Sequence, residues 1–172
     1  IPYLGLCYGM QLAVVEFARH MAGMADANTT EINPNTPYPV IDVMPEQKKL
    51  LEQNQYGNTM RLGNFNAELN KGTLVHKLYG HDKIVERHRH RYEVNPFYEN
   101  ALEKAGLVFS GKNPERNLVE FIELPNHLFF VGTQSHPEFK SRPLTPHPLF
   151  AGFIKAAIAK QHEQLHEKET LR

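Results

Sequence analysis

The spacing of hydrophobic residues predicts a strand followed directly by a helix at the start of the chain. Residues 1–6 are a short apolar run, which is typical of a buried strand. From residue 8 to about residue 24, apolar side chains recur every three or four positions, which predicts a helix with one hydrophobic face. The positions on that face are Met10, Val14, Phe17 and Met21. The prolines within residues 26–39 then indicate a loop.

Short strands and helices alternate through the rest of the chain. Strands are predicted at residues 38–44, 59–63 and 83–94, the second of them after a turn at residues 57–58. Helices are predicted at residues 45–54, 73–78, 95–106 and 148–166. We expect Thr73 to cap the second of these helices, and Asn95 and Gly106 to begin and end the third.

Three further strands, at residues 107–111, 118–124 and 128–133, are separated only by turns, which predicts an antiparallel β-meander. Together the elements predict an α/β domain. Its central sheet is expected to be mostly parallel and flanked by helices on both faces, as in flavodoxin-like folds, with the meander near the C-terminal half. The charged residues from about 160 to 172 predict a solvated tail.

The composition is that of a globular domain and excludes several classes of function. The chain has 172 residues, of which 41% are hydrophobic and 22% are charged, enough for one domain with a core. Lys plus Arg and Asp plus Glu both number 19, so charge gives no reason to expect a nucleic-acid partner. The sequence has no apolar run that could span a membrane and no signal peptide, and one cysteine fits the reducing cytoplasm. Because the chain starts at Ile1, almost inside a predicted strand, we expect it to be part of a longer protein.

The single cysteine lies between the first strand and the first helix and has a glycine on each side. Gly5, Cys7 and Gly9 form a Gly-x-Cys-x-Gly pattern, the cysteine version of a nucleophile elbow. A sharp turn leaves no room for flanking side chains, and the start of a helix favours the thiolate over the thiol. The pattern therefore predicts a nucleophile at Cys7. The alternative is a small, buried and unreactive side chain.

His136 and Glu138 are the predicted partners of Cys7. A nucleophilic cysteine needs a base, and the base needs a group that orients it. His136 follows a strongly apolar strand, where α/β sheets place their sites, and Glu138 follows two residues later. This order predicts a Cys7–His136–Glu138 triad. The alternative for His136 alone is a histidine on a surface loop.

Residues 86–94 alternate arginine and histidine. In an extended chain one face would carry His88, His90 and Tyr92, and the other would carry Arg87, Arg89 and Arg91. One interpretation is a basic patch for phosphate or nucleic acid, against which the neutral net charge argues. Another is a zinc site that adds His81 to the two histidines of the run. Since no cluster of acids or thiols supports zinc, we expect no metal in this chain.

Two motifs together resemble the class I (triad) glutamine amidotransferases. They are Gly5-Leu6-Cys7-Tyr8-Gly9-Met10-Gln11 and His136-Pro137-Glu138. Further segments resemble the branch of this family that supplies ammonia for the amination of UTP to CTP; they are residues 57–63, 86–95, 134–139 and 147–153. The likeness covers nearly the whole chain.

The resemblance implies a role for each member of the triad. Cys7 would attack the side-chain amide of L-glutamine, forming a thioester and releasing ammonia. His136 would take the thiol proton and deliver one to the leaving ammonia, and Glu138 would hold the imidazole. The backbone N–H of Tyr8 would be one oxyanion donor. The family's second donor comes from a glycine-rich loop upstream of the elbow, which this chain does not contain.

The resemblance also implies residues that bind substrate or effector. The substrate-binding set is Tyr8, Gly9, Met10, Gln11, Glu31, Arg91 and Tyr92. Glu31 would meet the ammonium group of glutamine and Arg91 its carboxylate, because a zwitterion needs one anion and one cation. Thr59 and Arg61 resemble a segment implicated in activation by GTP. The alternative for these two residues is an ordinary polar hairpin.

The remaining parts implied by the resemblance lie outside this chain. A separate synthase domain would use ATP and Mg²⁺ to activate UTP and would form a homotetramer, and no cofactor is expected in the chain itself. The chain would be the C-terminal part of the amidotransferase domain of a two-domain cytoplasmic enzyme. Two alternatives stay open: a related Cys-His-Glu hydrolase such as a γ-glutamyl hydrolase, and an inactive amidotransferase-like binding module.

Overall fold

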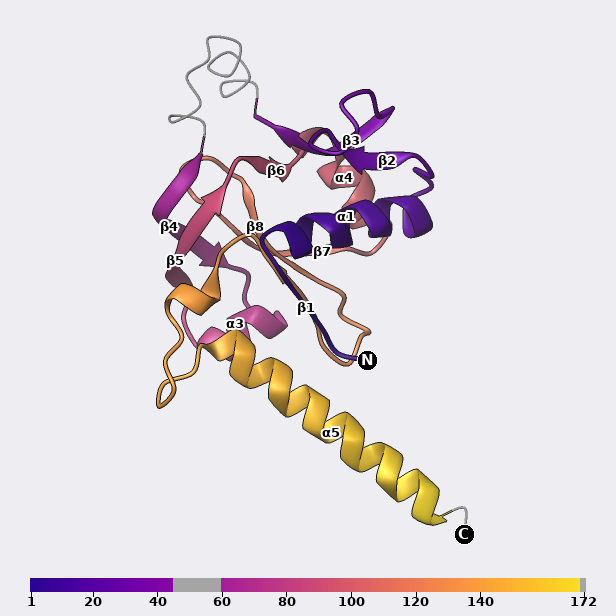
Figure 1. The fold of residues 1–172 in the computed structure, drawn as a ribbon, viewed down its shortest axis with the longest axis vertical. Helices are drawn as coiled ribbons and strands as arrows, with labels where there is room; N and C mark the ends of the chain where they lie inside the picture. The colour runs from indigo at the N-terminus through magenta and orange to yellow at the C-terminus, as the bar shows by residue number, and fades with distance from the viewer. Residues whose placement is uncertain (45–59, 171–172) are drawn as a thin grey trace.

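Two β-sheets form the centre of the protein in residues 1–44 and 60–170, which the computed structural model describes. The larger sheet has six strands in the order β1 (Tyr3–Leu6), β9 (Phe130–Thr133), β8 (Val119–Glu123), β7 (Val108–Lys112), β4 (Arg61–Leu69) and β5 (Lys83–His90). The smaller sheet has the order β2 (Ala27–Thr29), β3 (Tyr38–Val43) and β6 (Tyr92–Val94). Figure 1 shows the smaller sheet above the larger one.

The larger sheet is mixed. β1 pairs with β9 in parallel, whereas every other pairing of this sheet in the described residues is antiparallel. In the smaller sheet, β2 and β3 are parallel and β6 is antiparallel to β3. The expected α/β class and the meander β7–β8–β9 are confirmed, but the expectation of mostly parallel strands is corrected. Parallel neighbours need long crossover connections, and the short turns of the meander can join only antiparallel strands.

Helices cover both faces of the larger sheet, as predicted. They are α1 (Tyr8–Met21), α3 (Leu74–Tyr79), α4 (Pro96–Lys104) and α5 (Pro148–Thr170). One hydrophobic core joins α1 and α4 to the sheet, and a second core joins α3 and α5 to it. Ile122 of β8 belongs to the first core, and its neighbour Phe121 belongs to the second. Because successive strand residues point to opposite faces, the two cores lie on opposite sides of the sheet.

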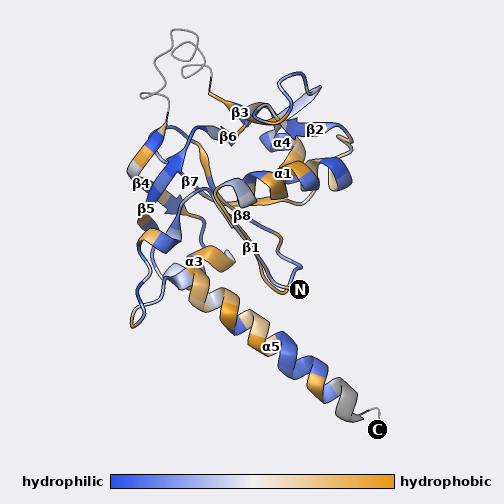
Figure 2. Ribbon diagram, in the orientation of Figure 1, coloured by the Kyte–Doolittle hydropathy of each residue, from blue (hydrophilic) through white to orange (hydrophobic). Residues whose placement is uncertain are grey.

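Helix α5 projects away from the rest of the protein (Figure 1). Its beginning packs closely on α3, since a Cβ placed on Gly152 would lie 2.6 Å from the Leu78 side chain. Its second half is largely hydrophilic (Figure 2), and the side chains of residues 161–166 are exposed. The helix continues past its predicted end near residue 166 to Thr170. No helix in the described part of the chain is long and apolar enough to cross a membrane.

The predicted helix caps are present. Thr73 Oγ1 accepts a hydrogen bond from the His76 N–H at 3.2 Å at the start of α3. Asn95 Oδ1 accepts one from the Phe97 N–H at 3.1 Å at the start of α4. Gly106 follows α4 with φ of 107°, a conformation that glycine adopts without strain.

Other element boundaries differ from the prediction. The short strand β2 lies inside residues 26–39, which were expected to be a loop. Strand β4 continues to Leu69, well beyond the predicted end at residue 63. The predicted helix at 45–54 and turn at 57–58 lie outside the described residues.

Strand β5 shows the predicted alternation. The side chains of Arg87 and Arg89 are exposed. The buried face consists of Glu86, His88 and His90. The strand ends at His90, and the chain bends at Arg91 before entering β6 in the smaller sheet. Tyr92 therefore does not continue the face of the two histidines, which corrects that part of the prediction.

Candidate active site

Cys7 lies at a sharp junction between β1 and α1. Its φ of 47° and ψ of −102° are uncommon for a residue other than glycine. The Cys7 N–H donates to Thr133 O at 2.7 Å and so ties the junction to the end of β9. A Cβ on Gly5 would lie 2.9 Å from backbone atoms of Gly9 and Met10, whereas a Cβ on Gly9 would meet no atom closer than 4.0 Å. The expected steric need for glycine is confirmed at Gly5 and is wrong at Gly9.

The Cys7 thiol is protonated in this environment. Its sulfur lies 4.0 Å from Arg89 O and 3.8 Å from Gln134 Nε2. Burial raises the pKa of the thiol to about 11, although the Tyr8 backbone N–H, which faces the sulfur, lowers it. The start of the helix was expected to favour the thiolate. Desolvation outweighs that effect, because a buried site disfavours the charged form.

His136 and Glu138 form an ordered pair after β9. His136 Nδ1 lies 2.6 Å from Glu138 Oε1, and Glu138 is held in the 3₁₀ turn η2 (Pro137–Phe139). A carboxylate only accepts hydrogen bonds, so the imidazole carries its hydrogen on Nδ1 and presents Nε2 as the basic nitrogen. His136 Nε2 is buried and has no hydrogen-bond partner in the described part of the chain. This nitrogen is therefore available to take a proton.

Strand β5 contacts both Cys7 and His136. It is an edge strand of the larger sheet. The His136 N–H donates to Arg87 O at 2.8 Å, and the Cys7 thiol points to Arg89 O. These two carbonyls are two residues apart on one strand, a spacing of about 7 Å. The thiol of Cys7 and the backbone of His136 therefore meet neighbouring carbonyls of one strand edge, and proton transfer from the sulfur to the imidazole stays a prediction.

A cavity of about 490 Å³ opens beside the thiol. Its lining residues are Cys7, Tyr8, Gln11, Glu31, Met60, Arg89, His90, Arg91 and Tyr92. Most of the predicted substrate-binding residues are in this set, but Gly9 and Met10 are not. The Met10 side chain is fully buried in the core beneath α1, so it cannot contact a substrate in the cavity.

Glu31 and Arg91 bring opposite charges to the cavity. Glu31 follows β2, and Arg91 lies at the bend between β5 and β6. Both are close enough to affect Tyr92: burial chiefly raises the pKa of Tyr92, Glu31 raises it further and Arg91 lowers it. An anion and a cation that face one cavity suit a zwitterionic ligand.

Residues 1–156 match the family model described as glutamine amidotransferase class-I. The chain belongs to the class-I glutamine amidotransferases. Among curated amidotransferase relatives, it is 57% identical over 166 residues to a CTP synthase of Thermus thermophilus, covering 94% of this chain and 30% of that protein. It is 58% identical over 157 residues to a CTP synthase of Sulfurisphaera tokodaii, covering 91% of this chain and 29% of that protein.

A solved structure shows the same amidotransferase fold. It is the glutaminase domain of Trypanosoma brucei CTPS with bound acivicin, with a TM-score of 0.83 and 39% identity. The match covers 92% of this chain and 61% of that one. The chain is thus similar to the amidotransferase part of CTP synthases, and it spans about three-tenths of the length of the curated relatives it matches.

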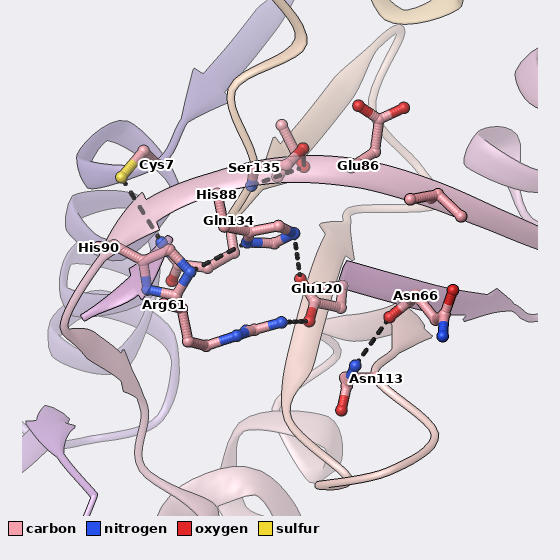
Figure 3. A network of polar contacts seen from close by, with 12 residues as sticks. Cys7, Arg61, Asn66, Glu86, His88, His90, Asn113, Glu120, Gln134 and Ser135 are labelled. Atoms are coloured by element: carbon pink, nitrogen blue, oxygen red, sulfur yellow. Dashed lines mark hydrogen bonds and ion pairs between the residues drawn. The ribbon is translucent and has the colours of Figure 1, made fainter. Parts of the chain in front are cut away.

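Gln134 is a residue of this amidotransferase site that sequence reasoning missed. It is buried, and its Nε2 points to the Cys7 sulfur (Figure 3). Its Oε1 accepts a hydrogen bond from Gln11 Nε2 at 3.2 Å, and Gln11 Nε2 also donates to Tyr92 O at 2.8 Å. A chain of amides therefore connects α1 and β6 to the thiol. The available signal was the position of Gln134 two residues before His136.

Arg61 lies inside the amidotransferase domain, although it was predicted to take part in the response to GTP. Its side chain is 1% exposed. Arg61 Nη2 is 2.5 Å from Glu120 (Figure 3), and Nη1 is 3.2 Å from Glu93. A buried, doubly paired guanidinium cannot reach a nucleotide at the surface, so the prediction is corrected for Arg61. Thr59 lies outside the described residues.

His88 and His90 contact each other rather than a metal ion in this amidotransferase. His88 Nδ1 lies 3.0 Å from His90 Nε2, and His81 is exposed at the surface. Among the residues that the structure describes, no three His, Cys, Asp or Glu side chains are grouped to hold a metal. The zinc interpretation therefore has no support in this part of the chain.

Proposed function

We propose that this chain is the glutaminase part of a CTP synthase. In this role it hydrolyses L-glutamine, and the ammonia is used by a separate synthase domain for the ATP- and Mg²⁺-dependent amination of UTP. The observation that carries the proposal is the shared cavity. One cavity is lined by the elbow cysteine and by the opposite charges of Glu31 and Arg91, and the ordered His136–Glu138 pair meets the same edge of β5 as the thiol.

In the first step, the Cys7 sulfur attacks the side-chain amide carbon of glutamine. Because the thiol is protonated at neutral pH, its proton moves to His136 Nε2 as the sulfur–carbon bond forms. Glu138 holds the Nδ1 hydrogen and stabilises the imidazolium cation. The carbon–nitrogen bond then breaks, the leaving nitrogen takes the proton from Nε2, and ammonia departs from a thioester on Cys7.

In the second step, water hydrolyses the thioester. His136 Nε2 takes a proton from the water, the oxygen bonds to the carbonyl carbon, and the sulfur leaves and regains its proton. The products are glutamate and the free thiol. The Tyr8 backbone N–H faces the sulfur and is the donor in this chain for the oxyanion that develops in both steps. Such a donor typically contributes about 2.7–4 kcal/mol to the transition state.

Substrate orientation comes from the two charged side chains of the cavity. Glu31 binds the ammonium group, and Arg91 binds the carboxylate, for which a guanidinium offers two parallel hydrogen bonds. Gln11 and Tyr92 complete the wall between them. The nucleotide substrates, the GTP effector and the contacts of a homotetramer belong in this proposal to the full-length enzyme.

The test uses the full-length protein that contains this chain. With UTP, ATP and Mg²⁺, we expect Cys7→Ser to abolish CTP formation from glutamine while CTP formation from ammonia continues. Failure of the unsubstituted enzyme with both nitrogen sources would reject the CTP synthase assignment and favour a hydrolase such as a γ-glutamyl hydrolase.

A second measurement tests the alternative that the chain is an inactive amidotransferase-like binding module. A glutamine-mimicking diazoketone should label Cys7 in the unsubstituted full-length protein, as detected by peptide mass spectrometry. Cys7→Ser serves as the unlabelled control. A folded protein in which Cys7 stays unlabelled would support the inactive module instead.

A further inference from the structure

A closed ring of five buried side chains adjoins the cavity, and one of its members, His90, is part of the cavity lining. Its members are Arg61, Glu93, His90, His88 and Glu120, each at most 6% exposed. Arg61 Nη1 is 3.2 Å from Glu93 Oε1, and Glu93 Oε1 is 3.4 Å from His90 Nδ1. His90 Nε2 is 3.0 Å from His88 Nδ1, and His88 Nε2 is 3.3 Å from Glu120 Oε2. Glu120 Oε1 returns to Arg61 Nη2 at 2.5 Å, as Figure 3 shows.

The contacts of the two histidines determine where their hydrogens lie. His90 Nδ1 is 3.1 Å from Tyr92 O, which can only accept, so Nδ1 carries the hydrogen. Burial lowers the pKa of His90 to about 3 and also lowers that of His88, and the charges of Arg61 and His136 add to both effects. Both rings are therefore neutral. His90 Nε2 is then an acceptor, His88 Nδ1 is its donor, and His88 Nε2 is left as a bare acceptor.

Glu120 Oε2 faces this bare acceptor. The oxygen is buried at 3.3 Å from His88 Nε2, and in the described part of the chain it has no aligned hydrogen-bond partner. A carboxylate oxygen opposite an acceptor nitrogen would be repelled, whereas a protonated carboxyl oxygen can donate to it. Both oxygens of Glu93 face N–H groups instead, at 3.2 Å and 3.5 Å from Arg61 Nη1. The contacts therefore place a proton on Glu120 and leave Glu93 ionised.

The charge balance of the ring agrees with a neutral carboxyl group. One guanidinium faces two carboxyl groups, and an additional buried anion without a partner would be strongly destabilising. Burial raises the pKa of Glu93 to about 8 and that of Glu120 to about 7. Outside the ring, Glu115 raises the pKa of Glu120 further, and Arg116 lowers that of Glu93. Of the two, the pKa of Glu93 is raised further, so the placement of the proton on Glu120 rests on the contacts of His88 Nε2 and not on these pKa values.

The ring supports the part of the cavity wall that carries Arg91. The hydrogen bond from His90 Nδ1 to Tyr92 O spans the bend at Arg91. The same carbonyl accepts the hydrogen bond from Gln11 Nε2. If His90 carried its hydrogen on Nε2 instead, the contact across the bend would be lost. The direction of the hydrogen bonds around the ring therefore affects how Arg91 is presented to the cavity.

We propose that Glu120 is a positioning residue of this site, kept as a neutral carboxylic acid that donates from Oε2 to His88 Nε2. Through His88 and His90, this hydrogen bond holds the bend that presents Arg91. The consequence for substrate binding rests on the proposed function, in which Arg91 binds the carboxylate of glutamine. The protonation of Glu120 does not depend on that function.

The first test compares Glu120→Gln with Glu93→Gln in the full-length enzyme. The amide at position 120 can accept from Arg61 and donate to His88, so it reproduces the contacts of the neutral acid. At position 93 the same change places an N–H group against other donors. We expect the thermal midpoint to fall by at most about 4 °C for Glu120→Gln and by about 10 °C or more for Glu93→Gln. The reverse order would overturn the proposal.

A spectroscopic test reports the proton directly. The infrared difference spectrum between the unsubstituted enzyme and Glu120→Gln at pH 7 should contain the C=O stretching band of a carboxylic acid. A spectrum that contains only carboxylate bands would show that Glu120 is ionised and would overturn the proposal. The matched difference spectrum for Glu93→Gln should contain carboxylate bands.

The third test measures the effect on substrate binding. Glu120→Leu keeps the approximate size of the side chain but can neither donate nor accept. We expect the KM for glutamine to rise about tenfold with a smaller change in kcat, because Arg91 is displaced while the triad is not. Glu120→Gln should stay within about twofold of the unsubstituted KM. Equal KM values for both variants would reject the positioning role.

Failure of the proposed function can be told apart from failure of this inference. If the unsubstituted enzyme hydrolyses no glutamine, the proposed function is wrong. The infrared spectra and thermal midpoints still decide whether Glu120 is neutral. If Glu120→Leu does not fold, the infrared spectrum and the thermal midpoint of Glu120→Gln still show whether Glu120 is neutral.

Discussion

Cys7 combines a strained backbone with a protonated side chain. A non-glycine residue at positive φ costs on the order of 1–3 kcal/mol, and here the hydrogen bond to Thr133 and the close packing at Gly5 hold it in place. The strain directs the sulfur into the cavity, and burial keeps it a thiol. Its reactivity therefore depends on His136 during the attack. A resting thiol is also less easily oxidised than a thiolate.

The pH dependence of alkylation tests the protonation of Cys7. Because the pKa of the thiol is raised to about 11, the thiolate fraction should grow about tenfold per pH unit from pH 7 to pH 9. We expect the rate of Cys7 alkylation by iodoacetamide, followed by peptide mass spectrometry, to rise across this range without a plateau. A small free thiol measured in parallel is the control for the reagent. A plateau near pH 7 would show that the resting enzyme holds a thiolate.

The two glycines of the elbow should respond differently to substitution. Gly5→Ala places a methyl group 2.9 Å from the backbone of α1, so we expect a loss of about 1–3 kcal/mol in the free energy of unfolding. Gly9→Ala has room and lies in a helix, where alanine is favoured, so its effect should stay within about 1 kcal/mol. Urea unfolding of both variants provides the comparison. Similar losses for both would contradict the geometry of the junction.

At the scale of elements, β5 serves the site with both its side chains and its backbone. Its buried side chains supply the two histidines of the ring, and its carbonyls at Arg87 and Arg89 receive the His136 N–H and the Cys7 thiol. Helix α3 is a second element whose position depends on polar contacts. Glu123 of β8 accepts from the N–H groups of Leu74 and Val75 at 2.9 Å and 2.8 Å. The carboxylate thus anchors the start of α3 to the sheet.

Both caps of α3 should contribute measurably to stability. We expect Thr73→Ala to lower the free energy of unfolding by about 1 kcal/mol, because one N–H of the first turn loses its acceptor. Glu123→Gln should cost about 2 kcal/mol, because an amide cannot accept both buried N–H groups as a carboxylate does. Thr145→Ala, at an exposed position, is the control and should stay within about 0.5 kcal/mol. An effect of Glu123→Gln no larger than that control would reject the anchoring role.

Local sequence was sufficient to predict the features that depend on neighbouring residues. The elbow at Cys7, the cap at Thr73 and the alternation along β5 each follow from a few adjacent positions. The catalytic triad was predicted from the elbow pattern and the position of His136 after a strand, whereas the zwitterion-binding residues came only through the family resemblance. Gln134 and the buried ring were missed because their partners are distant in sequence: Arg61 meets Glu120 only through the pairing order of the strands. That order also decides between a mixed and a parallel sheet, and hydrophobic pattern alone does not contain it.

At the scale of the whole molecule, the sheet separates the site from the helix at the C-terminal end of the chain. The core beneath α1 supports the elbow, and the core on the other face holds the beginning of α5. Leu149 is fully buried in that second core, whereas residues 161–166 are exposed on the projecting half of the helix (Figure 2). The two halves of α5 should therefore contribute unequally to stability.

Truncation of α5 tests whether its two halves contribute unequally to stability. We expect removal of residues 161–172 to change the thermal midpoint of this domain by less than about 2 °C, because the described side chains there are solvated. Leu149→Ala should instead cost about 2–5 kcal/mol, since it leaves a cavity in the core. Calorimetry of the full-length protein would measure both. A large loss on truncation would show that the projecting half is bound to another part of the enzyme.

The edge position of β5 has a consequence for solubility. An edge strand exposes a row of backbone groups that can recruit a strand from another molecule and start aggregation. In this protein, Val85 O receives the Lys140 ammonium, Arg87 O receives the His136 N–H and Arg89 O faces the Cys7 thiol. The residues of the active site therefore also occupy the edge that a foreign strand would use. Substitutions that loosen the His136 loop should increase the tendency of the protein to self-associate, in addition to lowering its activity.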